Sequence, residues 1–369
     1  MTIIDSTLRE GLQAVGVSFS LADKVAMVGE LVAIGIEEIE LGIASPRETE
    51  VAALVEAIRL THGRKARLAL WSRCRAEDIA LAANLDLDVL SLSIPVTDRL
   101  LKSKLGCCRS AALALIDRSV HQARDSFASV SLGLEDATRA EPEFLDAVVA
   151  CAAQAGASRV RLADTVGLGS PGTVGRLVSR VRERSGLAVG FHGHNDFGMA
   201  TANAVAALEA GASWIDATVL GLGERAGNAR LEEVVAYRAL RQGMGKYDLV
   251  RLRALSHRVA QAAGRAVAPQ QPVIGEDIFA CETGLHLLGL LDDPASYEPF
   301  APDSVGGERR LYFGAKSGLK AVERSLRAAG VILPKSGLEK VVASLRAQTE
   351  AGPLAAAELP EFARRVAAG

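Results

Sequence analysis

The sequence of 369 residues predicts an α/β protein, a closed (β/α)8 TIM barrel with a C-terminal, mostly helical appendage. Eight short β-rich runs alternate with amphipathic helical patterns, which is the order of elements that a parallel sheet requires. A doubly wound open sheet gives a similar order. The count of eight, and the absence of a Gly-x-Gly-x-x-Gly motif after the first run, favour the barrel.

The elements follow from local patterns along the chain. Helical stretches such as residues 21–35, 141–156 and 199–211 carry apolar residues at helical spacing, and each closes with a glycine. Such stretches separate the β-rich runs and supply the crossovers of a parallel barrel. The eight β-rich runs lie at residues 2–8, 37–42, 67–73, 89–95, 129–136, 159–165, 188–194 and 214–221.

The alternation stops after about residue 245. Residues 248–267 read as a helix with no strand after it, and the stretch from about 318 to 347 again reads as helices alone. We therefore expect two regions, a catalytic barrel over 1–245 and a helical C-terminal region over 246–369.

Composition excludes several function classes. A net charge of −2, a pI of about 6.4 and only 4% aromatic residues argue against a nucleic-acid partner. No uninterrupted apolar run approaches the roughly 18 residues of a membrane span, and the N-terminus does not resemble a signal peptide. Five cysteines in no repeating frame indicate a reducing compartment. We expect a cytoplasmic protein with neither membrane nor nucleic-acid partners.

Polar residues recur where the predicted strands end. In barrels of this kind the chemistry lies at the carboxyl ends of the strands, so these side chains are expected to share one face. A purely structural pattern would scatter them between both ends. They are Arg9 and Glu10 after the first run, Arg73 after the third, Glu135 and Asp136 after the fifth, Asp164 and Thr165 after the sixth, His192 and His194 at the end of the seventh, and residues 223–228 after the eighth.

The segment "FHGHND" (191–196) is the sharpest of these signals. Residues two apart in a strand project to the same side, so His192 and His194 can present both imidazoles to one point. With the Glu10 carboxylate they would hold a divalent cation (Mg, Mn or Zn) and leave positions open for substrate. Arg9 would then face the same cavity and meet a substrate anion or a developing alkoxide.

Three motifs carry a resemblance to a known family. The segments "DSTLREG" (5–11), "HGHNDFGMATANA" (192–204) and "GLGERAGNARLEEV" (221–234) resemble the metal-dependent acyltransferase and lyase barrels that include isopropylmalate, citramalate and homocitrate synthases. Residues 91–106, 133–145 and 279–305 are most similar to homocitrate synthases of the nitrogen-fixation type. The resemblance extends to about residue 320.

This resemblance implies a metal-assisted Claisen condensation of acetyl-CoA with 2-oxoglutarate. Arg9 would polarise the ketone, while His286, with Tyr297, would remove a proton from the acetyl methyl group. Because these two residues lie in the appendage, it must reach a barrel mouth, and a homodimer with shared sites is expected. Further residues at family positions are Glu135 and Thr165 in the pocket, Gln13 beside the substrate, and Asn228 as a metal ligand or its support.

Several positions depart from the family pattern. The main ones are Leu12 in place of an acidic residue, Cys281 in place of a histidine, Ala315 and Lys316 in place of lysine and histidine, and Ser131 in place of an arginine. The last departure leaves the partner of the distal substrate carboxylate open, with Arg73 and Arg139 as candidates. Pyruvate, oxaloacetate and 2-oxoisovalerate therefore remain alternative substrates. A lyase is less favoured, as is a catalytically silent relative that binds acyl-CoA or metal.

Overall fold

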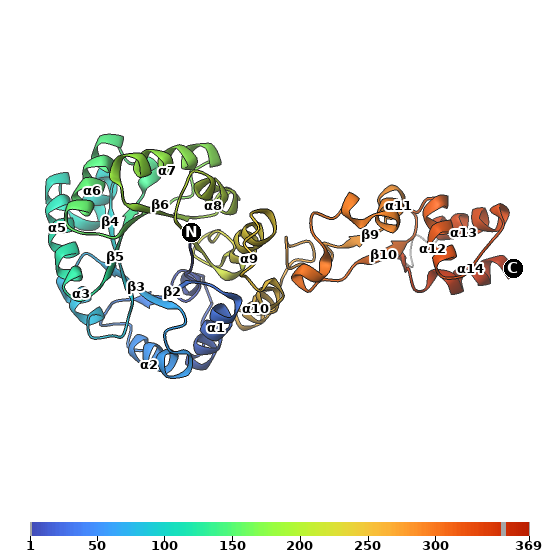
Figure 1. Ribbon diagram of the computed structural model, residues 1–369, viewed down its shortest axis with the longest axis horizontal. Coiled ribbons are helices and arrows are strands. Elements are labelled where there is room, and N and C mark those ends of the chain that lie inside the picture. The colour runs from blue at the N-terminus through green and yellow to red at the C-terminus, as the bar shows by residue number, and fades with distance from the viewer. Residues whose placement is uncertain (1, 348–351, 369) are drawn as a thin grey trace. The chain divides into compact units, whose positions relative to one another are not determined.

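The computed structural model describes residues 2–347 and 352–368, and the chain divides after Ala266 into two units. The first unit contains a closed barrel of eight parallel strands, which confirms the predicted fold (Figure 1). Strand β8 closes on β1, with Trp214 opposite Thr2 and Ala217 opposite Asp5. The strands are β1 (Thr2–Asp5), β2 (Glu38–Ile43), β3 (Arg67–Arg73), β4 (Val89–Pro95), β5 (Ser129–Glu135), β6 (Arg159–Asp164), β7 (Ala188–Gly193) and β8 (Trp214–Ala217).

Helices surround the barrel, and local capping explains where two of them begin. Ser20 and Asp23 form a reciprocal capping box at α1, and Ser170 and Thr173 do the same at α7. The larger helices are α1 (Leu21–Ile34), α2 (Val51–His62), α3 (Ala76–Ala82), α5 (Arg109–Arg124), α6 (Pro142–Gln154), α7 (Pro171–Ser185), α8 (Ala200–Glu209), α9 (Leu231–Ala236) and α10 (Leu249–Ala262). Among the described residues, no helix has the length and apolar character that a membrane crossing needs.

Short helical turns follow several strands and carry cavity residues. They are η1 (Gly11–Gln13), α4 (Asp98–Leu100), the π-helical turn η2 (Leu101–Leu105), η3 (Ala137–Arg139), η4 (Val219–Gly221) and the π-helical turn η5 (Tyr237–Arg241). These turns lie after β1, β4, β5 and β8, except η5, which continues α9.

Two strands end earlier than the sequence predicts. The first run was expected to reach residue 8, but β1 ends at Asp5 because the Ser6 carbonyl accepts hydrogen bonds from the backbone of Arg9 and Glu10. The eighth run was expected to reach residue 221, but β8 ends at Ala217, and η4 follows it. Both early ends turn the backbone inward over the carboxyl end of the barrel.

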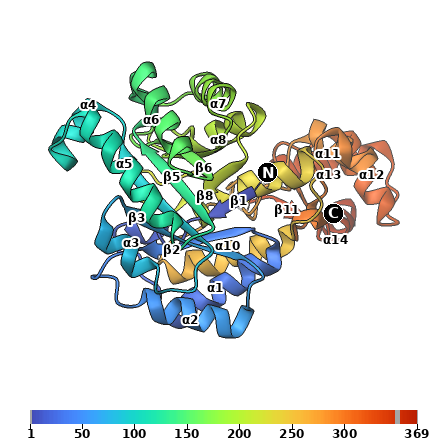
Figure 2. The same ribbon diagram turned by 60° about the vertical axis from the view of Figure 1, so that its left-hand side comes forward.

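The boundary between the units lies later than the predicted residue 245. Helix α10 belongs to the first unit and lies alongside α1, where the Asp248 amide donates to the Ile34 carbonyl at 3.0 Å (Figures 1 and 2). Its apolar side, including Leu252 and Val259, is buried. Burial of this face explains why the helix stays with the barrel.

The second unit has its own core and a small sheet that the sequence did not predict. Strand β10 (Arg310–Phe313) lies between β9 (Ala280–Cys281) and β11 (Leu354–Ala355). Phe313 of the central strand is buried together with Leu287 and Val341. The helices are α11 (Gly284–Asp292), η6 (Pro294–Ser296), η7 (Pro302–Val305), α12 (Leu319–Ala328), α13 (Lys335–Ala347) and α14 (Leu359–Ala368).

The barrel interior contains ion pairs in place of some of the usual branched aliphatic layers. Arg159 on β6 pairs with Glu38 on β2 and lies 4.2 Å from the centre of the Trp214 ring. One layer nearer the carboxyl ends, Arg161 pairs with Glu40 at 3.0 Å. All four charged side chains are buried, and Arg161 reaches the cavity described next.

Candidate active site

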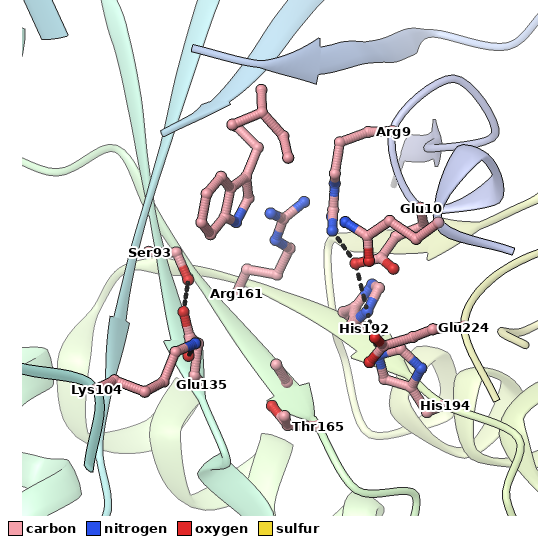
Figure 3. Close-up of a pocket in the computed structure, with 15 residues that line it drawn as sticks. Arg9, Glu10, Ser93, Lys104, Glu135, Arg161, Thr165, His192, His194 and Glu224 are labelled. Atoms are coloured by element: carbon pink, nitrogen blue, oxygen red, sulfur yellow. Dashed lines mark hydrogen bonds and ion pairs between the residues drawn. The ribbon is translucent and has the colours of Figure 1, made fainter. Parts of the chain in front are cut away.

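A cavity of about 250 Å³ lies at the carboxyl ends of the strands (Figure 3). Its walls come from strands on both sides of the barrel and from the turns that follow β1, β4 and β8. The lining residues are Arg9, Glu10, Gln13, Ile43, Trp71, Ser93, Lys104, Gly133, Glu135, Arg161, Ala163, Thr165, His192, His194 and Glu224.

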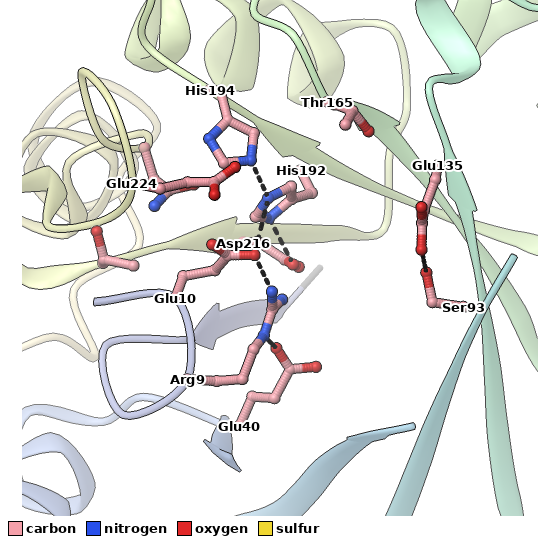
Figure 4. Close-up of polar contacts among 12 residues, drawn as sticks. Arg9, Glu10, Glu40, Ser93, Glu135, Thr165, His192, His194, Asp216 and Glu224 are labelled. Carbon is pink, nitrogen blue, oxygen red and sulfur yellow. Dashed lines mark hydrogen bonds and ion pairs between the residues drawn. The ribbon is translucent and has the colours of Figure 1, made fainter. Parts of the chain in front are cut away.

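Arg9 and Glu10 enter the cavity from the turn after β1. Both are nearly enclosed, at 7% and 5% exposure, and their side chains pair with each other. Arg9 Nε also donates to Glu40 Oε2 at 2.6 Å (Figure 4). Because an unpaired buried charge costs several kcal/mol, these contacts explain how the turn tolerates both residues inside the barrel mouth.

His192 and His194 converge at the end of β7, where their Nε2 atoms lie 3.3 Å apart. His192 Nδ1 lies 3.1 Å from Asp216 Oδ2 on β8 (Figure 4). Burial alone would raise the pKa of Asp216, but Arg161 and His192 lower it to about 2, so the carboxylate is ionised and only accepts. The proton of neutral His192 is therefore assigned to Nδ1, which leaves Nε2 free as a ligand atom.

Both imidazoles are neutral at physiological pH. Burial lowers the pKa of His192, and burial together with the neighbouring His192 lowers the pKa of His194 to about 3. Neutral imidazole is the form that binds a metal ion.

The donor set fits a divalent cation. One ligand atom from each of Glu10, His192 and His194 lies within 4.8 Å of the others. Glu10 Oε2 and His194 Nδ1 are buried without a hydrogen-bond partner among the described residues, which is an unfavourable state for polar atoms. Two imidazoles and a carboxylate match the ligand types of Mn²⁺, Zn²⁺ and related ions. These three residues therefore form a group that can hold a metal ion.

Asn228 lies beside this group but does not line the cavity. Its backbone forms a bridge with His194, and its Nδ2 donates to the Leu222 carbonyl at 2.9 Å. Asn228 Oδ1 is buried without a partner among the described residues. The geometry favours support of the His194 segment over direct ligation.

Three further predicted residues line the cavity, Glu135 and Thr165 from β5 and the end of β6 and Gln13 from the turn after β1. Glu135 accepts a hydrogen bond from Ser93 Oγ at 3.0 Å and pairs with Lys104, while the Thr165 hydroxyl accepts from the Asp136 amide at 2.8 Å. Gln13 is exposed at the mouth. The structure thus gathers these residues around the same cavity as the metal-binding group.

The structure places Arg73 and Arg139, the two predicted partners of the distal substrate carboxylate, outside the residues that line the cavity. Arg73 makes two hydrogen bonds to Asp78, at 2.6 and 3.0 Å, and Arg139 makes two to Asp136, both at 2.8 Å. Each guanidinium is engaged by a carboxylate close to it in sequence. Proximity to a strand end was therefore an insufficient criterion for a substrate contact.

Sequence reasoning missed the charged residues inside the barrel. Arg161, Glu40 and Asp216 connect the cavity walls, with Arg161 Nη1 donating to Glu40 Oε1 at 3.0 Å and to Asp216 Oδ2 at 2.8 Å. A signal was present, since Glu38 and Glu40 alternate along one predicted strand as Arg159 and Arg161 do along another. Charges two apart in a buried strand face one side and require partners.

His286 and Tyr297 lie in the second unit, unlike the other predicted site residues. Their ring centroids are 4.5 Å apart with a tilt of 47°, and both side chains are exposed. Gly289 on α11 permits this packing, because a Cβ there would lie 2.2 Å from a Tyr297 ring carbon. Their predicted catalytic role stays a prediction.

The fold and the donor set define a class, a barrel enzyme with a metal-binding group at the carboxyl ends of its strands. Residues 1–259 match the HMGL-like family, and residues 273–353 match the homocitrate synthase post-HMGL domain-like family. The chain belongs to the HMGL-like family, with the second domain found in homocitrate synthases. It is an acyltransferase of the condensing type.

Curated relatives are similar over most of their length. A homocitrate synthase from Frankia alni is 43% identical, covering 88% of this chain and 93% of the relative. Homocitrate synthase 1 from Nostoc sp. is 41% identical, covering 94% and 92%. A 2-phosphonomethylmalate synthase from Streptomyces rubellomurinus is 39% identical, covering 90% and 88%. Relatives with differently named products thus match this chain to a comparable degree.

Solved structures support the barrel fold. The HMG-CoA lyase from Bacillus subtilis superposes with a TM-score of 0.65 at 18% identity, covering 72% of this chain and 94% of the lyase. At this identity the likeness concerns the fold alone.

Proposed function

We propose that this protein condenses acetyl-CoA with 2-oxoglutarate to form homocitrate and CoA. The observation that carries the proposal is the convergence of Glu10, His192 and His194 beside the Arg9 guanidinium in one cavity. Two relatives named homocitrate synthase support the choice of substrate. The similarity of residues 91–106, 133–145 and 279–305 to homocitrate synthases of the nitrogen-fixation type adds to it.

Glu10, His192 and His194 would hold the cation, with Asp216 orienting His192. Bound there, a divalent cation would polarise the ketone of the 2-oxo acid. Mg²⁺, Mn²⁺ and Zn²⁺ are all candidates for it.

Arg9 would donate to the ketone oxygen and stabilise the negative charge that develops there. One such preorganised donor contributes roughly 3 kcal/mol to the stabilisation of a transition state. The contacts of Arg9 with Glu10 and Glu40 hold its side chain in the cavity and reduce the reorganisation needed during reaction. Thr165 and Glu135 would orient the substrate from the opposite wall.

His286, with Tyr297, would act as the base that removes a proton from the acetyl methyl group. The methyl carbon then forms a bond to the ketone carbon, and hydrolysis of the thioester releases CoA. An imidazole suits this step because its ordinary pKa lies near neutrality. The Tyr297 ring packs against the imidazole, with the ring centroids 4.5 Å apart.

The same chemistry on another 2-oxo acid is the second candidate. Oxaloacetate, pyruvate and 2-oxoisovalerate belong to it. The relative named 2-phosphonomethylmalate synthase adds 3-phosphonopyruvate, the 2-oxo acid whose condensation with acetyl-CoA would give a phosphonomethyl product. A catalytically silent relative is disfavoured because Arg9, Glu10, both barrel histidines and His286 are all present.

A substrate screen tests the proposal. The metal-loaded protein is incubated with acetyl-CoA and each 2-oxo acid, free thiol is followed, and the product is identified by mass spectrometry. We expect the highest kcat/KM with 2-oxoglutarate, and no thiol release above background after His192→Ala. A tenfold preference for a monocarboxylic oxo acid, about 1.4 kcal/mol in transition-state binding, would overturn the homocitrate assignment.

A further inference from the structure

We propose that Arg161 binds the terminal anionic group of the substrate, and so makes the enzyme selective for 2-oxo acids with a second negative charge. This inference rests on the proposed function and deepens it. Arg161 lies on β6, lines the cavity and is 4% exposed (Figure 3).

The guanidinium of Arg161 has N–H donors that make no hydrogen bond to the described residues. Its Nη1 atom makes both hydrogen bonds, to Glu40 and to Asp216. Its Nε and Nη2 atoms have no hydrogen-bond partner among the described residues. These two atoms are also not among the fully buried polar atoms that lack a partner. Since Arg161 borders the cavity, these two donors are the ones available to a ligand, and a carboxylate or phosphonate matches such a fork.

Both carboxylates that hold Arg161 are shared with other groups. Glu40 also accepts from Arg9, and Asp216 also accepts from His192. Arg161 is therefore held through one nitrogen, Nη1, and its other two nitrogens remain free to donate. Its partners keep it protonated and fix its direction, which is the preorganisation that selective anion binding requires.

Arg161 also lies at a suitable depth. It precedes the cavity residues Ala163 and Thr165 by two and four positions on the same side of β6, and two strand residues span about 7 Å. Thr165 follows the strand end, whereas Arg161 forms part of the inner wall. A 2-oxo acid whose first carboxylate lies near the mouth would extend its other end inward, toward Arg161.

Besides Arg161 itself and Arg9, which the proposed mechanism places at the ketone, the cavity is lined by the cation Lys104, which is less suited to this role. Lys104 is exposed, and its ammonium already pairs with Glu135. A solvated lysine that exchanges one carboxylate for another gains little, because water screens both contacts. A contact of a ligand with Arg161, unlike one with Lys104, would be shielded from water.

Arg159 provides a matched control on the same strand. It is 2% exposed and faces the same side as Arg161, but it does not line the cavity. Two of its nitrogens bond to Glu38, and its guanidinium lies over the Trp214 ring. Substitution of Arg159 therefore disturbs a buried ion pair without removing a cavity donor.

The test compares two substrates that differ only at the far end. 2-Oxoglutarate and 2-oxopentanoate have the same five-carbon chain, and the second lacks the terminal carboxylate. We expect the wild type to prefer 2-oxoglutarate by about 100-fold in kcat/KM, and Arg161→Met to bring this ratio close to one. Arg161→Lys should keep part of the preference, while Arg159→Met should keep all of it.

The outcomes separate selectivity from structural support. Equal losses on both substrates in Arg161→Met would mean that Arg161 only supports its neighbours, and would overturn the proposal. Loss of the preference in Lys104→Gln, with retention in Arg161→Met, would also overturn it. If Arg161→Met does not fold, as judged by circular dichroism and metal content, the ratio for Arg161→Lys decides, and an unchanged ratio refutes the proposal.

Calorimetric titration of the metal-loaded protein measures the same ratio without turnover. Absence of condensation with every 2-oxo acid would refute the proposed function and leave this binding comparison intact. A preference for 3-phosphonopyruvate over 2-oxoglutarate, abolished in Arg161→Met, would uphold Arg161 as the anion-binding residue and change the assigned substrate.

Discussion

At the scale of single residues, the barrel mouth is a connected set of buried charges. The connection runs from Arg9 to Glu40, from Glu40 to Arg161, from Arg161 to Asp216, and from Asp216 to His192. Removal of one member leaves a buried partner without its counter-charge, which costs more than the pair itself contributes. His192 and the inner wall of the cavity are therefore not independent.

Asp216→Asn should weaken metal binding about 10- to 100-fold, because the residue that orients His192 loses its charge. Competition with a chromophoric chelator would measure the affinity. Asp164→Asn is the control, since the buried Asp164 carboxylate at the end of β6 accepts hydrogen bonds from Thr138 and from the backbone amides of Leu168 and Gly169, in the loop that follows the strand. Equal affinity in the wild type and Asp216→Asn would show that Asp216 does not orient the ligand.

At the scale of elements, the periodic parts of the fold were predictable and the turns were not. Strands β3 and β4 have the bounds that their hydrophobic runs predict. The β-rich run at the N-terminus extends past the end of β1 to Leu8. Leu8 is buried, but it lies in a turn and not in a strand. The pattern of apolar residues in a sequence indicates which residues are buried. It does not indicate the hydrogen bonds to the Ser6 carbonyl, and these bonds end the strand.

In the candidate site, too, some residues were predictable from the sequence and others were not. The convergence of Glu10, His192 and His194 was predictable because these residues combine a strand-end position with ligand chemistry. Arg73 and Arg139, predicted as substrate contacts, do not line the cavity but bond to Asp78 and Asp136, local contacts that strand positions do not reveal. The place of Arg161 in the cavity could not be predicted without knowing which strands face each other across the barrel.

In the second unit, one glycine controls how Tyr297 packs on α11. Gly289→Ala would place a methyl group 2.2 Å from the Tyr297 ring and displace the ring from His286. If the two side chains act together in proton transfer, kcat should fall about tenfold or more, while metal content stays unchanged.

Gly337→Ala on α13 is the matched control for that variant. A Cβ at Gly337 meets its neighbours only at 3.5 Å or more, so the alanine should fit and stabilise the helix by about 0.5–1 kcal/mol. An unaltered kcat in Gly289→Ala would argue that the Tyr297 position is irrelevant to the reaction.

At the scale of the whole molecule, the chain separates its predicted chemistry between two units. The metal-binding group and Arg9 belong to the barrel, and His286 and Tyr297 belong to the unit after Ala266. The proposed condensation would need all of them at one reacting centre. We propose a homodimer in which the second unit of one subunit completes the site of its partner.

Mixing two inactive variants tests this arrangement. Arg9→Ala removes a barrel residue and His286→Ala removes the base, so a mixed dimer with shared sites holds one intact site and one doubly altered site. Random pairing makes half of the dimers mixed, and activity should therefore return to about one quarter of the wild-type value. Thiol release measures it after the chains are unfolded and refolded together.

The matched control is a mixture of Arg9→Ala with His192→Ala, two variants of the same unit. No exchange of the second unit between subunits can assemble an intact site from this pair, so no activity should return. Heterodimer formation is verified by copurification of two different tags. Verified heterodimers of Arg9→Ala with His286→Ala that remain inactive would exclude shared sites, because each mixed dimer would then contain two sites that each lack one essential group.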